Sequence, residues 1–175
     1  GRHTVFTVVK NNVDAWGNTY GSHENYSVSR DLDPARLTAW LVPFLVARQY
    51  LGGSGRWHRG RFTLSQRCDA LADVVSAHTT RSRPLINTRD EPHADPSRFR
   101  RLHVISGDSH LVEPAAWLSL VATELVVRLA ETTRTPPPGP ADPIAALRAW
   151  GHDPDAAVAD ERGGALTCAD VLHAW

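Results

Sequence analysis

The segment from Arg101 to Val104 alternates polar and apolar residues with the period of a β-strand. Arg101 and His103 fall on one face of this strand, and Leu102 and Val104 fall on the other. The polar face must either contact water or line a pocket, because burial of unpaired polar groups is costly. The chain is therefore expected to form strands with a polar face in front and helices behind them.

The remaining patterns predict an α+β fold with short strands. The clearest helix runs from Glu113 to Glu131, and its apolar stripe is expected to face the core. Another helix is expected to begin at Asp33-Pro34, which combines an N-cap residue with a first-turn proline. The expected stripe residues of the 113–131 helix are Leu118, Val121, Leu125, Val126 and Leu129. Strand-like segments lie at 3–11, 22–30, 62–67, 85–89 and 102–106, and on the second of these His23 and Asn25 would share one face while Glu24 points to the other. Short helix candidates lie at 69–77, 143–150 and 168–175, and Asp142-Pro143 and Thr167 are the expected starts of the last two.

A proline-rich stretch divides the chain. Residues 134–141 are expected to form a linker, because this composition favours an extended conformation without a core. Residues 1–133 would then form the main body, and residues 142–175 would form a short helical C-terminal segment. A chain of 175 residues with 42% apolar residues suits one ordinary domain.

Composition limits the classes of function. Nineteen basic and nineteen acidic residues cancel, which argues against a general nucleic-acid or membrane-surface binder. No apolar run approaches the roughly 20 residues that cross a bilayer, and the first residues do not resemble a signal peptide. Cys68 and Cys168 form neither a metal-type spacing nor a disulfide framework. A reducing, cytoplasmic location is therefore expected.

A dense run of ionisable groups leads into the polar strand. Nine such side chains fall within the 15 residues from Arg89 to His103. One interpretation is a solvated loop whose charges pair with one another. The other is a pocket in which several arginines and histidines bind an anionic ligand with a divalent metal. The residues alone leave both interpretations open.

Several ordered blocks of the sequence resemble the family of Pup ligases and Pup deamidases (depupylases), where Pup is the prokaryotic ubiquitin-like protein of actinobacteria. The strongest block is residues 79–95, which read TTRSRPLINTRDEPHAD. The other blocks are residues 10–14, 17–26, 43–49, 64–67, 100–105 and 107–109. The resemblance implies part of a glutamine-synthetase-like domain, in which a curved antiparallel sheet is backed by helices, with ATP and Mg²⁺ as cofactors.

The resemblance also implies roles for five residues. His23 and His103 match positions on the metal side of the sheet. Arg67 and Arg89 match arginines that hold phosphate and serve catalysis, and Arg101 is a further candidate for the same pocket. Fixed arginine charges suit this task, because a transferring phosphoryl group spreads negative charge over its oxygens.

The implied reaction is carboxylate–amine ligation. A Pup-like protein or a small glutamate-type donor would be activated as an acyl phosphate, and an amine such as a protein lysine would attack it. Residues 18–20 and 79–84 resemble the ligase branch, whereas Ser22 resembles the depupylase branch, which hydrolyses the amide or isopeptide bond. A non-catalytic Pup-binding or regulatory module is a third possibility.

The chain also departs from the family pattern. It resembles the C-terminal half of the catalytic domain, and the family's N-terminal metal-binding segment and catalytic aspartate strand have no counterpart in it. A partner chain or a missing N-terminal segment is therefore expected to supply the metal carboxylates and the catalytic base. Residues 110–113 and Ser27 also differ from the common family residues, which puts strict specificity for Pup in question.

Overall fold

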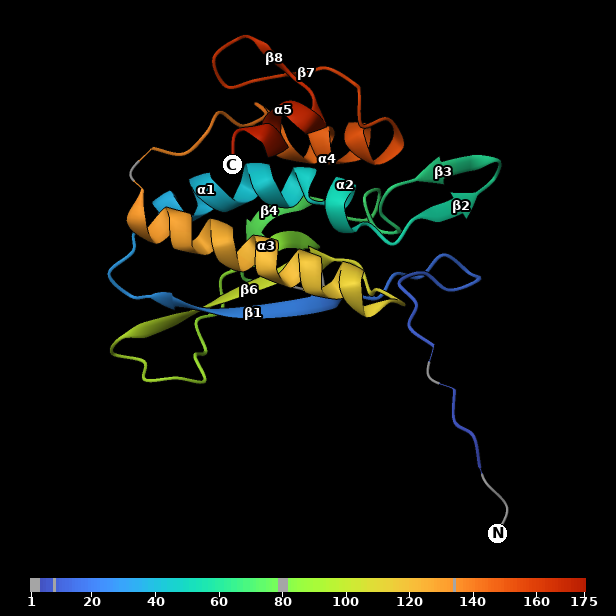
Figure 1. The fold of residues 1–175 in the computed structure, drawn as a ribbon, viewed down its shortest axis with the longest axis horizontal. Coiled ribbons are helices and arrows are strands. Elements are labelled where there is room, and N and C mark those ends of the chain that lie inside the picture. Colours follow the sequence, from blue (N-terminus) through green and yellow to red (C-terminus); the bar gives the residue numbers. More distant parts are fainter. Residues whose placement is uncertain (1–3, 8, 79–81, 134) are drawn as a thin grey trace.

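The computed structural model describes residues 4–7, 9–78, 82–133 and 135–175. Its centre is a four-stranded sheet in the order β1-β6-β5-β4. Helices α1 and α3 cover one face of this sheet, and no helix of the described residues covers the other face (Figure 1). The strands are β1 (Ser22–Ser29), β4 (Asp73–Ser76), β5 (Pro84–Asn87) and β6 (Phe99–Gly107). The α+β prediction is confirmed, although the β4–β5 pair is parallel within an otherwise antiparallel sheet.

Helix α1 (Pro34–Ala47) begins where the sequence predicts. The Asp33 side chain caps it by accepting a hydrogen bond from the Ala35 backbone N–H, and Pro34 occupies the first turn. The helix continues through Pro43, and α2 (Gln49–Gly52) follows directly. Nearly all of its second half is buried, so α1 forms the centre of the hydrophobic core between the sheet and the C-terminal layer.

Helix α3 (Glu113–Thr132) also forms as predicted, but it turns a different face inward. Leu118 and Leu125 of the predicted stripe are 40% and 59% exposed. The inward face is set by a buried polar contact, because Arg48 Nη1 donates to Thr123 Oγ1 at 2.7 Å. The buried residues of α3 are Ser119, Thr123, Val126, Val127 and Ala130. The stripe prediction was therefore wrong in part, since periodicity within one helix does not reveal a polar partner such as Arg48, which lies between α1 and α2.

A third layer lies over α1 and contains the C-terminal elements (Figure 1). It comprises α4 (Pro143–His152), β7 (Val158–Ala159), β8 (Ala165–Leu166) and α5 (Cys168–His173). Asp142 and Thr167 cap the two helices, as their positions in the sequence predict. Trp150 and Val171 belong to the same core as α1. The division at residues 134–141 stays a prediction.

Three local predictions were wrong. The described residues of segment 3–11 are exposed and form no strand, because β-branched residues need a neighbouring strand to pair with. Segment 69–77 contains strand β4 instead of a helix, since β5 offers it a pairing edge. The strand predicted at 62–67 ends at Thr63 as β3 (Arg61–Thr63), which pairs with β2 (Arg56–His58). Among the described residues, no helix combines the length and hydrophobicity that crossing a bilayer requires.

Candidate active site

The helix-free face of the sheet carries the polar side chains predicted for it. Asn25 of β1 pairs with His103 of β6, so the two residues lie on the same face of the sheet. Ser27 and Arg101 form the next pair on that face. On the opposite face, the Glu24 side chain points toward the helices and is buried. We call the helix-free side the open face, and the alternation in β1 and β6 predicted it correctly.

Two histidines meet on the open face. His23 Nδ1 lies 3.1 Å from His103 Nε2, and the rings meet edge to face. Burial, together with the charges of Arg67 and Arg101, lowers the pKa of His23. Burial, the Arg101 charge and the neighbouring His23 lower the pKa of His103 to about 4. Both imidazoles are therefore neutral near pH 7, which is the state that ligates metals.

Arg67 is built into the edge of the same site. Its side chain is buried, and Nη1 donates to the backbone carbonyls of Ile105 at 2.6 Å and Gly107 at 3.0 Å. Burial lowers the pKa of Arg67, whereas the charge of Asp108 acts in the opposite direction. The two carbonyls fix the guanidinium close enough to His23 for its charge to lower the pKa of that imidazole.

Asp108 holds the loop that carries Arg67. Its carboxylate accepts hydrogen bonds from Ser54 N–H at 3.0 Å, Ser65 Oγ at 3.0 Å and Gln66 N–H at 3.1 Å. These bonds replace the ladder that would have continued β3, so residues 64–67 form a loop pinned to the end of β6. Asp108 is not among the residues that the sequence predicts for the site. The one signal for it was its place in the family-like block at 107–109.

Arg101 reaches across the open face. Its Nε donates to Asn25 Oδ1 at 2.7 Å, and Nη1 lies 3.3 Å from the exposed Glu91 carboxylate. These contacts hold the guanidinium beside the histidine pair, where its charge lowers the pKa of both imidazoles. Arg83, which is not among the predicted site residues, adds positive charge that also lowers the pKa of Arg67.

Arg89 stands apart from the other predicted residues. It follows β5 and is exposed, and its backbone N–H donates to Asn87 Oδ1 at 3.0 Å. Among the contacts of the described residues, none joins its guanidinium to the histidine pair. The structure therefore brings together four of the five predicted side chains and leaves Arg89 at the end of β5.

The open face suits an anion. Among the buried nitrogens of the described residues that lack a hydrogen-bond partner, three belong to residues at this face, namely Arg67 Nε, Asn87 Nδ2 and His103 Nδ1. Arginine and amide nitrogens are donors, and phosphate oxygens accept hydrogen bonds from them without offering a proton. Because buried donors usually find a partner, a phosphate group fits this face.

The histidine pair fits two positions of a metal site. Two adjacent ligands of an octahedral ion with bonds of about 2.1 Å lie about 3.0 Å apart, close to the 3.1 Å between the imidazole nitrogens. Mg²⁺ prefers oxygen ligands, however. Glu24 does not provide one, because its carboxylate faces the helices and pairs with Arg48 Nη1 at 2.6 Å. The described residues thus fit the phosphates and part of the coordination of a metal.

The fold and this face define an α+β protein whose sheet presents arginine and histidine side chains on its helix-free side. Residues 2–175 match the Pup-ligase protein family, and the chain belongs to this family.

The relatives share this sequence over much of the chain. It is 43% identical to a Pup–protein ligase of Brachybacterium faecium, in a match that covers 100% of the chain and 41% of the relative. It is 53% identical to a Pup–protein ligase of Xylanimonas cellulosilytica, in a match that covers 82% of the chain and 33% of the relative. The chain therefore spans between a third and two fifths of the length of these curated relatives.

Two solved structures share the fold. The first is the Pup ligase PafA of the prokaryotic ubiquitin-like modification pathway in complex with ADP. It has a TM-score of 0.84 and 38% identity, over 95% of this chain and 38% of that chain. The second is the complex between Pup and its ligase PafA. It has a TM-score of 0.82 and 38% identity, over 94% of this chain and 34% of that chain.

Proposed function

We propose that the chain is part of an ATP- and Mg²⁺-dependent carboxylate–amine ligase of the Pup-ligase type. The observation that carries this proposal is the gathering of His23, His103, Arg67 and Arg101 on the open face. The family and its ADP-bound member support it. The carboxylate donor is a glutamate side chain on a Pup-like protein or a smaller glutamate-type molecule, and the acceptor is an amine such as a protein lysine.

The proposed chemistry has two steps. A carboxylate oxygen of the donor attacks the γ-phosphorus of ATP, which gives an acyl phosphate and ADP. The amine then attacks the acyl carbon, the carbon–oxygen bond to phosphate breaks, and an amide and inorganic phosphate form. The amine loses a proton to a base supplied from outside the described chain.

The arginines stabilise the first step. Arg67 and Arg101 donate N–H groups to the phosphoryl oxygens, and Arg89 adds a third positive charge from the end of β5. Because the carbonyls of β6 already fix Arg67, little reorganisation is needed when negative charge builds up. When bound, Mg²⁺ neutralises part of the phosphate charge.

A segment beyond this chain completes the site. His23 and His103 hold one side of the metal, while the metal carboxylates and the catalytic base come from an N-terminal segment or a partner chain. The orientation of Glu24 supports this proposal, because its carboxylate is engaged by Arg48 and Tyr26 behind the sheet.

The test follows the products of the reaction. The protein that contains this chain, purified from its own host, is incubated with Mg-ATP, Pup ending in glutamate and a lysine-bearing acceptor protein. We expect one ADP for each new isopeptide bond, counted by mass spectrometry. Hydrolysis of a preformed conjugate without ligation would establish the depupylase alternative, and failure to use ATP would establish a binding module. Either result would overturn the ligase proposal.

A further inference from the structure

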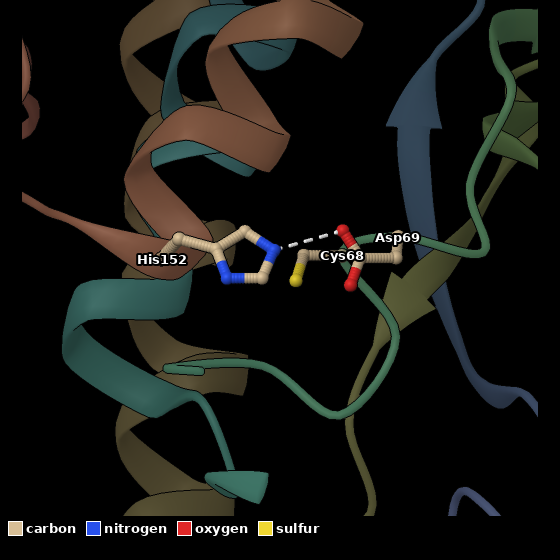
Figure 2. Close-up of side chains that lie close together, drawn as sticks. All are labelled: Cys68, Asp69 and His152. Atoms are coloured by element: carbon tan, nitrogen blue, oxygen red, sulfur yellow. Dashed lines mark hydrogen bonds and ion pairs between the residues drawn. The ribbon is translucent and has the colours of Figure 1, made fainter. Parts of the chain in front are cut away.

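A second group of functional side chains lies away from the open face. Cys68 and Asp69 belong to the loop that follows Arg67, and His152 is the last residue of α4. Figure 2 shows the three side chains turned toward one another, and their ligand atoms all lie within 4.8 Å of one another. Among the residues that the structure describes, this is the one group of three His, Cys, Asp or Glu side chains with such an arrangement.

We propose that Cys68, Asp69 and His152 form a binding site for a divalent transition metal of the zinc class. Their spacing is close to what a shared ion requires. Two ligands with bonds of about 2.0 Å at the tetrahedral angle lie about 3.3 Å apart. His152 Nε2 and Asp69 Oδ1 are 3.1 Å apart. A sulfur and a nitrogen on the same zinc ion lie about 3.6 Å apart, so Cys68 Sγ needs to approach by at most about 1.2 Å.

The ligand types select the metal. A thiolate with an imidazole and a carboxylate suits Zn²⁺, whereas Mg²⁺ and Ca²⁺ take oxygen ligands. A thiolate and a carboxylate together also neutralise a divalent ion. This neutrality matters, because the neighbouring cavity of about 340 Å³ is lined by Arg56, Arg59 and Arg61, whose charges would repel an uncompensated cation.

The same cavity gives the ion a route to the site. Asp69 and His152 both line it, so a water molecule can approach from this side as the fourth ligand. Cys68 closes the opposite side, where its Sγ lies 3.6 Å from the Ser65 carbonyl oxygen. Burial raises the pKa of the free Cys68 thiol to about 12. Metal binding therefore breaks the S–H bond, forms the sulfur–metal bond and releases the proton to solvent.

The site would fasten the C-terminal layer to the loop of Arg67. One backbone bond already joins them, from Leu64 N–H to the Gly151 carbonyl at 2.8 Å. His152 Nε2 also contacts Asp69 Oδ1, and a shared ion would bring Cys68 into this link between α4 and the loop. Since the three ligands meet only in the folded chain, the metal binds the folded state preferentially and stabilises it.

The test uses Co²⁺ on chelator-treated protein, because cobalt reports sulfur ligation by a thiolate-to-metal charge-transfer band. We expect this band at one Co²⁺ per chain. Cys68→Ser should abolish it, and Cys168→Ser should leave it unchanged. Cys168 is a matched control, since it is equally buried but bonds the Ala47 carbonyl instead. The sulfur band also separates this site from the histidine pair on the open face.

The other ligands provide a second measurement. His152→Gln and Asp69→Asn alter exposed side chains, and each should weaken Zn²⁺ binding by more than about 100-fold in a competition titration with a chelator. Absence of the cobalt band in the unmodified protein would overturn the proposal. So would a band that survives Cys68→Ser, a band lost equally in Cys168→Ser, or Zn²⁺ affinity unchanged by both ligand substitutions.

Discussion

Arg67 and Arg89 share a predicted role in phosphate binding but occupy different environments. Arg67 is buried and bound to two carbonyls of β6, whereas Arg89 is exposed. Arg67→Ala leaves those carbonyls unpaired, so it should lower the free energy of unfolding by about 2–4 kcal/mol. Arg89→Ala should change it by less than about 0.5 kcal/mol. Urea denaturation of the two variants measures the difference, and equal losses would contradict the placement of Arg67.

His103 makes stability depend on pH in the metal-free protein. In the unfolded chain its imidazole has a pKa of about 6.5 and takes up a proton on acidification. In the folded chain, burial together with the charges of Arg101 and His23 lowers the pKa of His103 to about 4, so the folded imidazole stays neutral over most of the range between the two pKa values. The unfolded state therefore binds more protons between these values. The free energy of unfolding should fall by about 1–3 kcal/mol as the pH drops from 7 to 4.

The contribution of His103 to the pH dependence of stability can be measured by comparing variants. Denaturation at several pH values, with a chelator present, should give a shallower pH profile for His103→Gln than for the unmodified protein. His78→Gln is the matched control, because His78 is exposed. A profile that His103→Gln leaves unchanged would show that the histidine pair is not protected from protonation.

At the scale of elements, Asp108 determines where the Arg67 loop lies. Asp108→Ala removes an acceptor shared by Ser54, Ser65 and Gln66, so it should cost about 2–4 kcal/mol of stability. Hydrogen exchange should also quicken at the Ser54 and Gln66 amides. Asp31→Ala, at an exposed position, should change neither quantity appreciably. Unchanged exchange at both amides would mean that the loop is held by other contacts.

The sequence predicted elements well where the signal is local. The caps of α1, α4 and α5 and the alternation in β1 and β6 each lie within one segment, and all were confirmed. The strand predicted at 3–11 and the helix predicted at 69–77 were wrong, because a strand forms only where another strand pairs with it. Which face of α3 points inward depends on the contact between Thr123 and Arg48, and Arg48 lies 75 residues earlier in the sequence.

The functional sites, too, could be predicted from the sequence only where the signal is local. Alternation placed Arg101 and His103 on one face, and the family resemblance supplied their roles. The contact of Asp108 with Ser65 spans 43 positions, and that of His152 with Asp69 spans 83. No spacing rule detects pairs so far apart, so the spacing of Cys68 and Cys168 gave no indication of a metal site.

In the whole molecule, the residues that the structure describes form three layers, and none of their helices covers the open face of the sheet (Figure 1). The C-terminal elements pack on α1 on the far side from the open face, so they support the site without covering it. The chain matches 41% and 33% of the length of two curated relatives, so most of each relative lies outside the matched part.

We propose that the open face binds the phosphates of a nucleotide. The most direct measurement is the affinity for Mg-ADP, by titration calorimetry, of the protein that contains this chain and of two variants. Arg101→Ala should weaken binding by about 10–100-fold, because it removes a charge-assisted donor. Arg98→Ala, in the exposed loop where Arg98 stacks on Phe99, should change it by less than about 2-fold. Equal affinities in the two variants and the unmodified protein would contradict the assignment of the open face.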